Sequence, residues 1–286
     1  INGVSGNNLA LNGVITPSVA GSLTVNVESP AVIGTLGAKY SGAFDLTKDG
    51  PGILSLGNIA NNYTGITQVN NGTLRPGNTN ALSRFSNINL ATAGTLDLAG
   101  INVVTGSITG TGLVTNNSGT GVNLATGFDN TSFTFSGRFG SANQTSTSFN
   151  LNKIGTGTMT IDSAAGTGTM SIGTFTTSQG TSVLSGAAGS TKFVTYTIPE
   201  GGTLILDNTS ANLNNRLGGT DFAVGAALVR NITLQGGEFK IIGNAGAATV
   251  ETLNLGTVGA IGVQSGGSII TLDANASQSL ILSAGN

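Results

Sequence analysis

The chain has 286 residues and a net charge of −2, and charged residues make up only 8% of it, against about 25% in an average soluble domain. This composition excludes the basic surface that nucleic acids or anionic membranes attract, and the lack of cysteine excludes disulfides and thiolate metal sites. Glycine is abundant, with 46 residues, and the mean hydropathy is +0.22, which favours an ordered all-β protein with many turns over a disordered chain.

The first predicted strands fall in residues 7–30, where apolar and polar residues alternate and Glu28 is the only acidic residue. No apolar run in the chain is long enough to span a membrane, so we expect no membrane insertion. The chain starts with Ile1 rather than methionine and ends in LILSAGN, and both ends are interpreted as cuts in something longer.

From residue 52 onward one short phrase recurs: a glycine, then a residue that is usually small or β-branched, then a pair of alternating apolar residues. Such alternation turns one side of a strand inward, and the glycine permits a corner before it. The phrase occurs at residues 52–56, 72–76, 94–98, 157–161, 168–172, 202–206 and 237–241.

The spacing of these phrases predicts a solenoid, in which each coil stacks its strands on those of the previous coil. The linkers are longer than the two-residue turns of hairpins, which favours a parallel β-helix, with a β-sandwich as the alternative. We expect one elongated solenoid over residues 1–286, with irregular coils around 110–150. Only TDFAVGAALVRN, at 220–231, could form a short helix.

A longer version of the recurring phrase occurs twice in the chain. Residues 46–56 read LTKDGPGILSL and residues 151–161 read LNKIGTGTMTI, so Lys48 matches Lys153 and Gly50 matches Gly155. A lysine before a glycine-rich corner is expected to be solvated or to pack through its aliphatic stem, and neither lysine is interpreted as a site.

Residues 48–82 resemble the autotransporter-associated β-strand repeat, also called the passenger-associated transport repeat. The family pattern runs roughly K-x-G-x-G-x-L-x-L, then N-x-Y-x-G-x-T-x-V, then G-x-L. The stretch 151–161 keeps only the first third of it as a partial second copy. The residues that carry the resemblance are Lys48, Gly50, Gly52, Leu54, Leu56, Asn62 (next to Asn61), Tyr63, Gly65, Thr67, Val69, Gly72 and Leu74.

This resemblance implies a right-handed parallel β-helix that is secreted or displayed on a bacterial cell surface. The repeat describes a structural unit and implies no activity. Within it, Tyr63 is expected to plug a corner of the solenoid or to stack on the next coil, with contact to carbohydrate as the alternative.

A pair of carboxylates is the candidate considered for catalysis, and the usual bases and nucleophile partners are missing because the chain has no histidine or cysteine. No two of them lie within three residues of each other in the sequence, and Asp97 and Asp162 are expected to lie on a solvated face. We therefore expect no enzyme, no catalytic, cofactor-binding or metal-binding residue, and no cofactor.

The function expected from the sequence is that of an extracellular or cell-surface fibre protein with an adhesive role and possible contacts to surface glycans. A polysaccharide-acting β-helix enzyme and a phage tail-fibre or glycan-binding module are the alternatives. The strand-like ends, at 7–30 and 266–286, contain few charges, so we expect copies of the chain to associate end to end through exposed strand edges. The alternative is that these edges are open because they continue into neighbouring coils of a longer chain.

Overall fold

The computed structural model describes residues 9–11, 14–15, 21–58, 60–140, 149–163, 173–191, 193–217, 231–254, 261–275 and 278–285. The strand predicted at 168–172 lies outside these ranges, as does the possible helix at 220–231 apart from Asn231. Within the described ranges the chain forms strands and turns and no helix.

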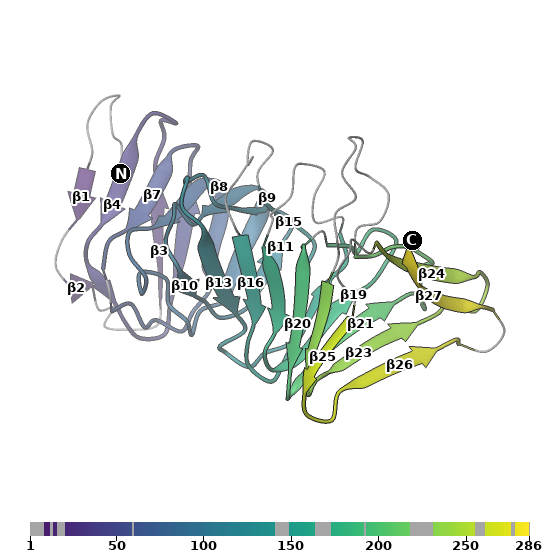
Figure 1. Cartoon of the computed structure of the whole chain (residues 1–286). Coiled ribbons are helices and arrows are strands. Elements are labelled where there is room, and N and C mark those ends of the chain that lie inside the picture. The colour runs from purple at the N-terminus through teal and green to yellow at the C-terminus, as the bar shows by residue number, and fades with distance from the viewer. Residues whose placement is uncertain are drawn as a thin grey trace.

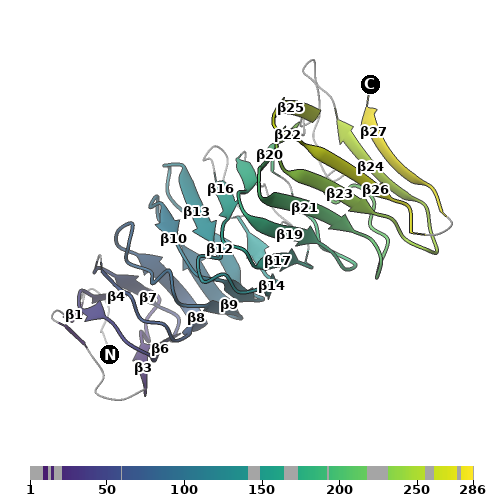
Figure 2. The same cartoon turned by 90° about the horizontal axis from the view of Figure 1, so that it is seen from below.

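The strands stack along one long axis, with the two ends of the chain at opposite ends of the stack (Figures 1 and 2). Every pairing between the described strands is parallel, and the one antiparallel contact is an isolated bridge between Pro199 and Gly236. Parallel strands that pair with strands about one coil away in the sequence form a parallel β-helix. The predicted β-helix is therefore confirmed, and the β-sandwich alternative is wrong.

The main sheet contains two columns of stacked strands, and β8 (Thr67–Pro76) and β9 (Ile88–Asp97) each contribute one half to both columns. The shorter column joins these halves to β1 (Leu9–Leu11), β4 (Ile33–Leu36), β7 (Ile53–Leu56), β12 (Leu113–Thr115) and β15 (Arg138–Phe139). The longer column joins them to β3 (Gly21–Asn26), β6 (Phe44–Asp49), β11 (Ile108–Gly110), β14 (Phe133–Phe135), β17 (Thr158–Ile161), β19 (Gly180–Leu184), β21 (Gly202–Asp207), β23 (Glu238–Ile242) and β26 (Ile269–Asp273).

A second sheet begins near residue 103 and continues to the C-terminal end. It consists of β10 (Val103–Val104), β13 (Val122–Thr126), β16 (Phe149–Lys153), β18 (Thr174–Thr177), β20 (Thr195–Pro199), β22 (Asn231–Gln235) and β25 (Ile261–Ser265). Two further pairs lie near the ends: β2 (Val14–Ile15) with β5 (Lys39–Tyr40), and β24 (Thr249–Asn254) with β27 (Leu280–Gly285).

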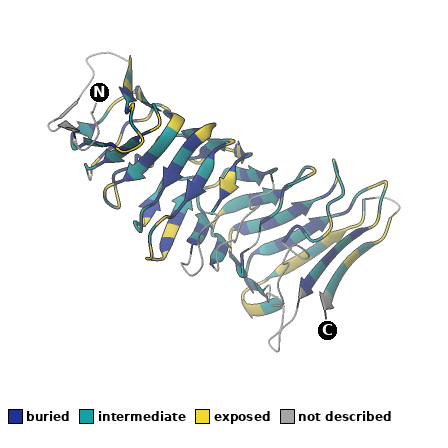
Figure 3. Cartoon of the chain, turned by 90° about the horizontal axis from the view of Figure 1, so that it is seen from above, coloured by how far each residue is buried: buried dark blue, intermediate teal, exposed yellow. Residues whose placement is uncertain are grey.

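The core is a set of stacked apolar side chains, because the inward positions of successive strands coincide. Leu54 pairs with Leu74, and Leu74 pairs with Leu96, and all three are fully buried. Burial alternates along the strands in the same way through most of the stack (Figure 3). The recurring phrase is thus the inward-outward pattern of a coil wall, as the sequence predicts.

Several strands of the longer column have no counterpart among the predicted phrases, and β19 is the one that lies between two strands that the phrases predict. β19 stacks between β17 and β21, and it pairs Ser182 with Met159 on one side and Leu204 on the other. Ser182 is buried and accepts a hydrogen bond from Thr177 Oγ1 at 2.9 Å. Because the inward position of β19 holds a serine instead of an apolar residue, the recurring phrase does not mark this strand.

The two copies of the long phrase occupy different sides of the solenoid. Lys48 belongs to the longer column of the main sheet, in which the next members are Val69 and Leu90. In the second copy that column holds Ile161, whereas Lys153 lies in the second sheet, paired with Thr126. The phrase therefore specifies a corner between two strands, and the corner has moved by one side between the copies.

Candidate functional site

Lys48 lies inside the corner that follows β6. Its side chain is fully buried, and Nζ donates to the carbonyl oxygens of Asp49 at 2.8 Å, Gly50 at 2.7 Å and Asn71 at 3.0 Å. The third acceptor belongs to the next coil, so one ammonium group holds two coils together. Burial lowers the pKa of Lys48 to about 8, and the nearby Asp49 carboxylate partly opposes this shift.

Lys153 repeats this arrangement at its own corner. It is fully buried, and Nζ donates to Ile154 O at 2.7 Å, Gly155 O at 2.8 Å and Gln179 O at 3.3 Å. Of the two environments predicted for these lysines, the solvated one is wrong, because a corner of parallel coils turns several carbonyl oxygens toward one point. Both lysines have a structural role, since their ammonium groups are fully occupied by backbone carbonyls.

Tyr63 plugs a corner of the solenoid, which confirms the first of the two roles expected for it. Its ring is fully buried, 5.3 Å from the ring of Phe44 and edge-on to Tyr40 at 6.4 Å. Its hydroxyl shares a hydrogen bond of 2.7 Å with Thr67 Oγ1. A side chain enclosed in this way makes no contact with an external carbohydrate.

Asp97 faces outward along its strand but is not solvated, so that prediction is also wrong. Arg75 from the preceding coil covers it and donates from Nη2 at 2.7 Å, and the backbone amides of Ala99 and Asn117 donate at 3.1 Å and 3.0 Å. Asp162 is half-buried, and its Oδ1 has no hydrogen-bond partner among the described residues. Within the described part of the chain, no group of three His, Cys, Asp or Glu residues is arranged to hold a metal ion.

A buried polar cluster near the C-terminal coils escaped the sequence analysis altogether. Arg216 is fully buried and donates to Asn208 Oδ1, to Gly189 O and, through Nη2, to the carbonyls of Gly186 and Ala211, all at 2.7–2.9 Å. Glu251 accepts from the backbone amide of Arg216 at 2.7 Å and from that of Leu217 at 3.0 Å. Burial lowers the pKa of Arg216 to about 10, and Asp207 and Glu251 oppose the shift.

The only sequence clue to this cluster is an arginine and a glutamate that stand alone among apolar and small polar residues. Their hydrogen bonds join the turn that holds Asn208 and Ala211 to the carbonyls of Gly186 and Gly189 and to β24, so the cluster is structural.

Opposite the main sheet, the coils between β5 and β10 close through turn segments instead of strands. Asparagine side chains hold these turns together: Asn58 donates to Gly37 O at 3.1 Å, and Asn78 donates to Gly57 O at 2.5 Å. Asn61 is buried and bridges three coils, because it accepts from Tyr40 N at 2.8 Å and donates to Ala81 O at 2.7 Å. The asparagine of the N-x-Y part of the family pattern is therefore Asn61 and not Asn62, which is exposed.

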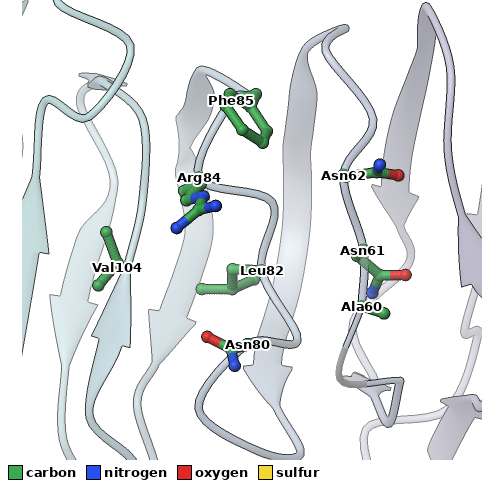
Figure 4. Close-up of a pocket in the computed structure, with 8 residues that line it drawn as sticks. All are labelled: Ala60, Asn61, Asn62, Asn80, Leu82, Arg84, Phe85 and Val104. Atoms are coloured by element: carbon green, nitrogen blue, oxygen red, sulfur yellow. The ribbon is translucent and has the colours of Figure 1, made fainter.

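A pocket of about 270 Å³ opens on this turn face, and its lining comes from three neighbouring coils (Figure 4). One coil contributes residues 60–62, the next contributes Asn80, Leu82, Arg84 and Phe85, and Val104 comes from the coil after that. The lining residues are Ala60, Asn61, Asn62, Asn80, Leu82, Arg84, Phe85 and Val104. Since it alone among these features is open and carries polar groups, this pocket is the candidate functional site.

The last coil exposes a second surface. Ile270 and Leu272 of β26 occupy the inward columns of Phe239 and Ile241, which are fully buried. They are nevertheless 43% and 50% exposed, because no strand stacks on β26 from the other side among the described residues. Val263 of β25 is 63% exposed for the same reason.

Comparison with known protein families places one of these segments in a named repeat. Residues 46–75 match the passenger-associated-transport-repeat. The match covers the corner of Lys48, the plug of Tyr63 and the strands on either side of them. The resemblance seen in the sequence is thus confirmed, and because the repeat is associated with autotransporter passenger domains, the match fits a surface protein.

No curated protein matches the chain. None of the described residues forms a helix with the length and apolarity that a membrane crossing needs.

Proposed function

We propose that this chain is a structural part of a secreted or surface-displayed bacterial protein, and that copies of it stack end to end into a fibre with an adhesive role. It acts as a scaffold and not as an enzyme. The observation that carries the proposal is one continuous column of the main sheet, in which the first and last strands each have one edge that no other described strand covers.

This column begins at Val25 of β3 and ends at Leu272 of β26. Each member pairs in parallel with the next one through eleven strands. Among the described residues β3 pairs only with β6, and β26 pairs only with β23. The free edge of β3 and that of β26 are opposite sides of the same kind of parallel ladder, so a second copy can add its β3 to β26 without any change of strand direction.

The apolar side chains at the free end supply the driving force. Ile270 and Leu272 would regain the burial that Phe239 and Ile241 have, because a following coil would cover them. β26 carries only Asp273 as a charged residue, so the edge lacks the charges that usually block edge-to-edge pairing. A head-to-tail contact of this kind does not close on itself and grows into a fibre.

Electron microscopy of the purified chain tests the proposal. We expect fibres that lengthen with protein concentration for the wild type, and short or single particles for Leu272→Lys, which puts a charge on the inward column. Thr271→Lys is the matched control, since it adds the same charge to the same strand at a half-buried position outside the inward column, and it should still form fibres. Single wild-type particles at high concentration would overturn the proposal.

A further inference from the structure

Arg84 is fixed at the rim of the pocket by two aromatic rings. Its guanidinium carbon lies 4.6 Å from the ring centroid of Phe128 and 5.2 Å from that of Phe85, and the two rings meet edge to face at 5.5 Å. The side chain is exposed and makes no hydrogen bond or ion pair with any described residue. Cation–π contacts of this kind orient a guanidinium group and leave its N–H donors free for a ligand.

Two asparagine amides near Arg84 are also free. Asn58, Asn61 and Asn78 use their side chains to hold backbone groups of neighbouring coils. The side chains of Asn62 and Asn80 make no hydrogen bond to another described residue, and both line the pocket. In Figure 4 they lie on adjacent coils, on either side of the opening that Arg84 borders.

We propose that this pocket binds one acidic sugar residue, a uronate, of a polysaccharide. Arg84 would hold the carboxylate, because the planar guanidinium fork matches a carboxylate in a bidentate contact. The amides of Asn62 and Asn80 each offer donors and an acceptor, as sugar hydroxyls require. The apolar floor of Leu82 and Val104 and the exposed Phe85 would contact the C–H face of the ring.

The size and charge of the pocket agree with this ligand class. Its volume of about 270 Å³ lies just below the range of about 300–1,000 Å³ of ligand pockets, so it has room for one ring and not for a large cofactor. No acidic residue lines it, so an anion meets no repulsion inside. A nucleic acid would need a basic surface, whereas the chain has a net charge of −2 and one arginine in this pocket.

This inference rests on the adhesive role proposed above, and it names the chemistry of the surface to which the chain would adhere. It is independent of fibre assembly, because the pocket lies in the early coils and the exposed apolar end lies in the last one. The two proposals can therefore fail separately: Arg84→Gln should form fibres as the wild type does.

The test is an NMR titration of the ¹⁵N-labelled Leu272→Lys chain, which should stay as short or single particles and keeps the pocket intact, with glucuronate, glucose and acetate as separate probes; the variants below are made in this background. We expect glucuronate to shift the amide signals around residues 60–62 and 80–85, and to bind at least about tenfold more tightly than glucose or acetate. Arg84→Gln should weaken glucuronate binding about tenfold or more, with little effect on glucose. Asn80→Ala should weaken the binding of both sugars.

Arg138→Gln is the charge-matched control, because it removes another exposed arginine that does not line the pocket, and it should bind glucuronate as the wild type does. Circular dichroism checks that each variant is folded. Three results would overturn the proposal: no shift with glucuronate, equal binding of acetate and glucuronate, or unchanged binding in Arg84→Gln.

Discussion

Lys48 and Lys153 make the same three hydrogen bonds at corners that lie on different sides of the solenoid. Each Nζ donates to the carbonyls of the next two residues and to one carbonyl of the following coil. Gly50 and Gly155 follow at the same spacing, with φ values of 75° and 72°. The short phrase is thus a transferable corner, in which a buried lysine satisfies the carbonyl oxygens that a sharp turn of parallel coils would otherwise leave unpaired.

Replacing either Lys48 or Lys153 should destabilise the fold, although neither residue lines the candidate functional site. Lys48→Met keeps the stem volume but leaves three carbonyl oxygens without their donor, and we expect the free energy of unfolding in urea to fall by about 2–4 kcal/mol. Lys153→Met should have a similar effect. Lys39→Met is the control, because the Lys39 side chain makes no hydrogen bond or ion pair with a described residue, and its loss should cost less than about 0.5 kcal/mol.

The same lysines predict how stability depends on pH. Burial lowers the pKa of each from 10.5 to about 8, so between pH 8 and pH 10 the unfolded chain binds more protons than the folded chain. The free energy of unfolding should therefore rise over this window, since a neutral amine still donates two hydrogen bonds and no longer costs the desolvation of a charge. A Lys48→Met/Lys153→Met double variant should lose most of this rise, and a rise equal to that of the wild type would contradict the assignment.

Gly72 should tolerate no side chain. It has a φ of 69°, and a Cβ there would lie 2.5 Å from both Gly50 O and Gly52 O of the preceding coil. Because both contacts are backbone atoms, we expect Gly72→Ala to cost about 3 kcal/mol or more in thermal or urea unfolding. Gly42→Ala is the control that tests the backbone conformation without a steric clash. Gly42 has a φ of 96°, but a Cβ there would meet nothing within 4 Å, so this substitution should cost only about 1–2 kcal/mol.

Arg216 should be as critical to the later coils as Lys48 is to the early ones. Arg216→Met would leave four oxygen acceptors in a buried site without their donor, and we expect a loss of about 3–5 kcal/mol. Hydrogen exchange should place the loss in residues 186–217 and 249–254, with the early coils unchanged. Equal loss of protection in β7 would show that the cluster is not local.

The strands of the coil wall could be predicted because their alternation of apolar and polar residues matches the alternation of inward and outward positions. Leu54, Leu74 and Leu96 alternate with polar residues, and the structure stacks them on one another. Ser182 shows the limit of this approach, since its inward position is filled by a hydrogen-bonded hydroxyl and no apolar residue marks the strand.

Features that depend on several coils could not be predicted in the same way. The burial of Lys48 depends on a carbonyl of Asn71, and that of Asp97 depends on Arg75, and neither partner is recognisable without the register of the coils. The pocket lies in turn segments that are held by asparagine side chains, and such segments have no hydrophobic period. The spacing Asn-x-Tyr did contain the information that Asn61, and not Asn62, is the buried bridge.

The central claim is that copies of this chain continue one another's β-ladder, and a designed disulfide tests it most directly. Thr24 and Thr271 each precede the terminal members of the continuous column, so in a head-to-tail stack they would face each other across neighbouring strands about 4.8 Å apart. That separation lies within the range that a disulfide bridges, and the chain has no cysteine of its own. Oxidised Thr24→Cys/Thr271→Cys protein should run as a ladder of covalent multimers on a non-reducing gel, and a mixture of the two single variants should give dimers that neither forms alone. Monomers only from the double variant, or dimers from one single variant alone, would contradict head-to-tail stacking.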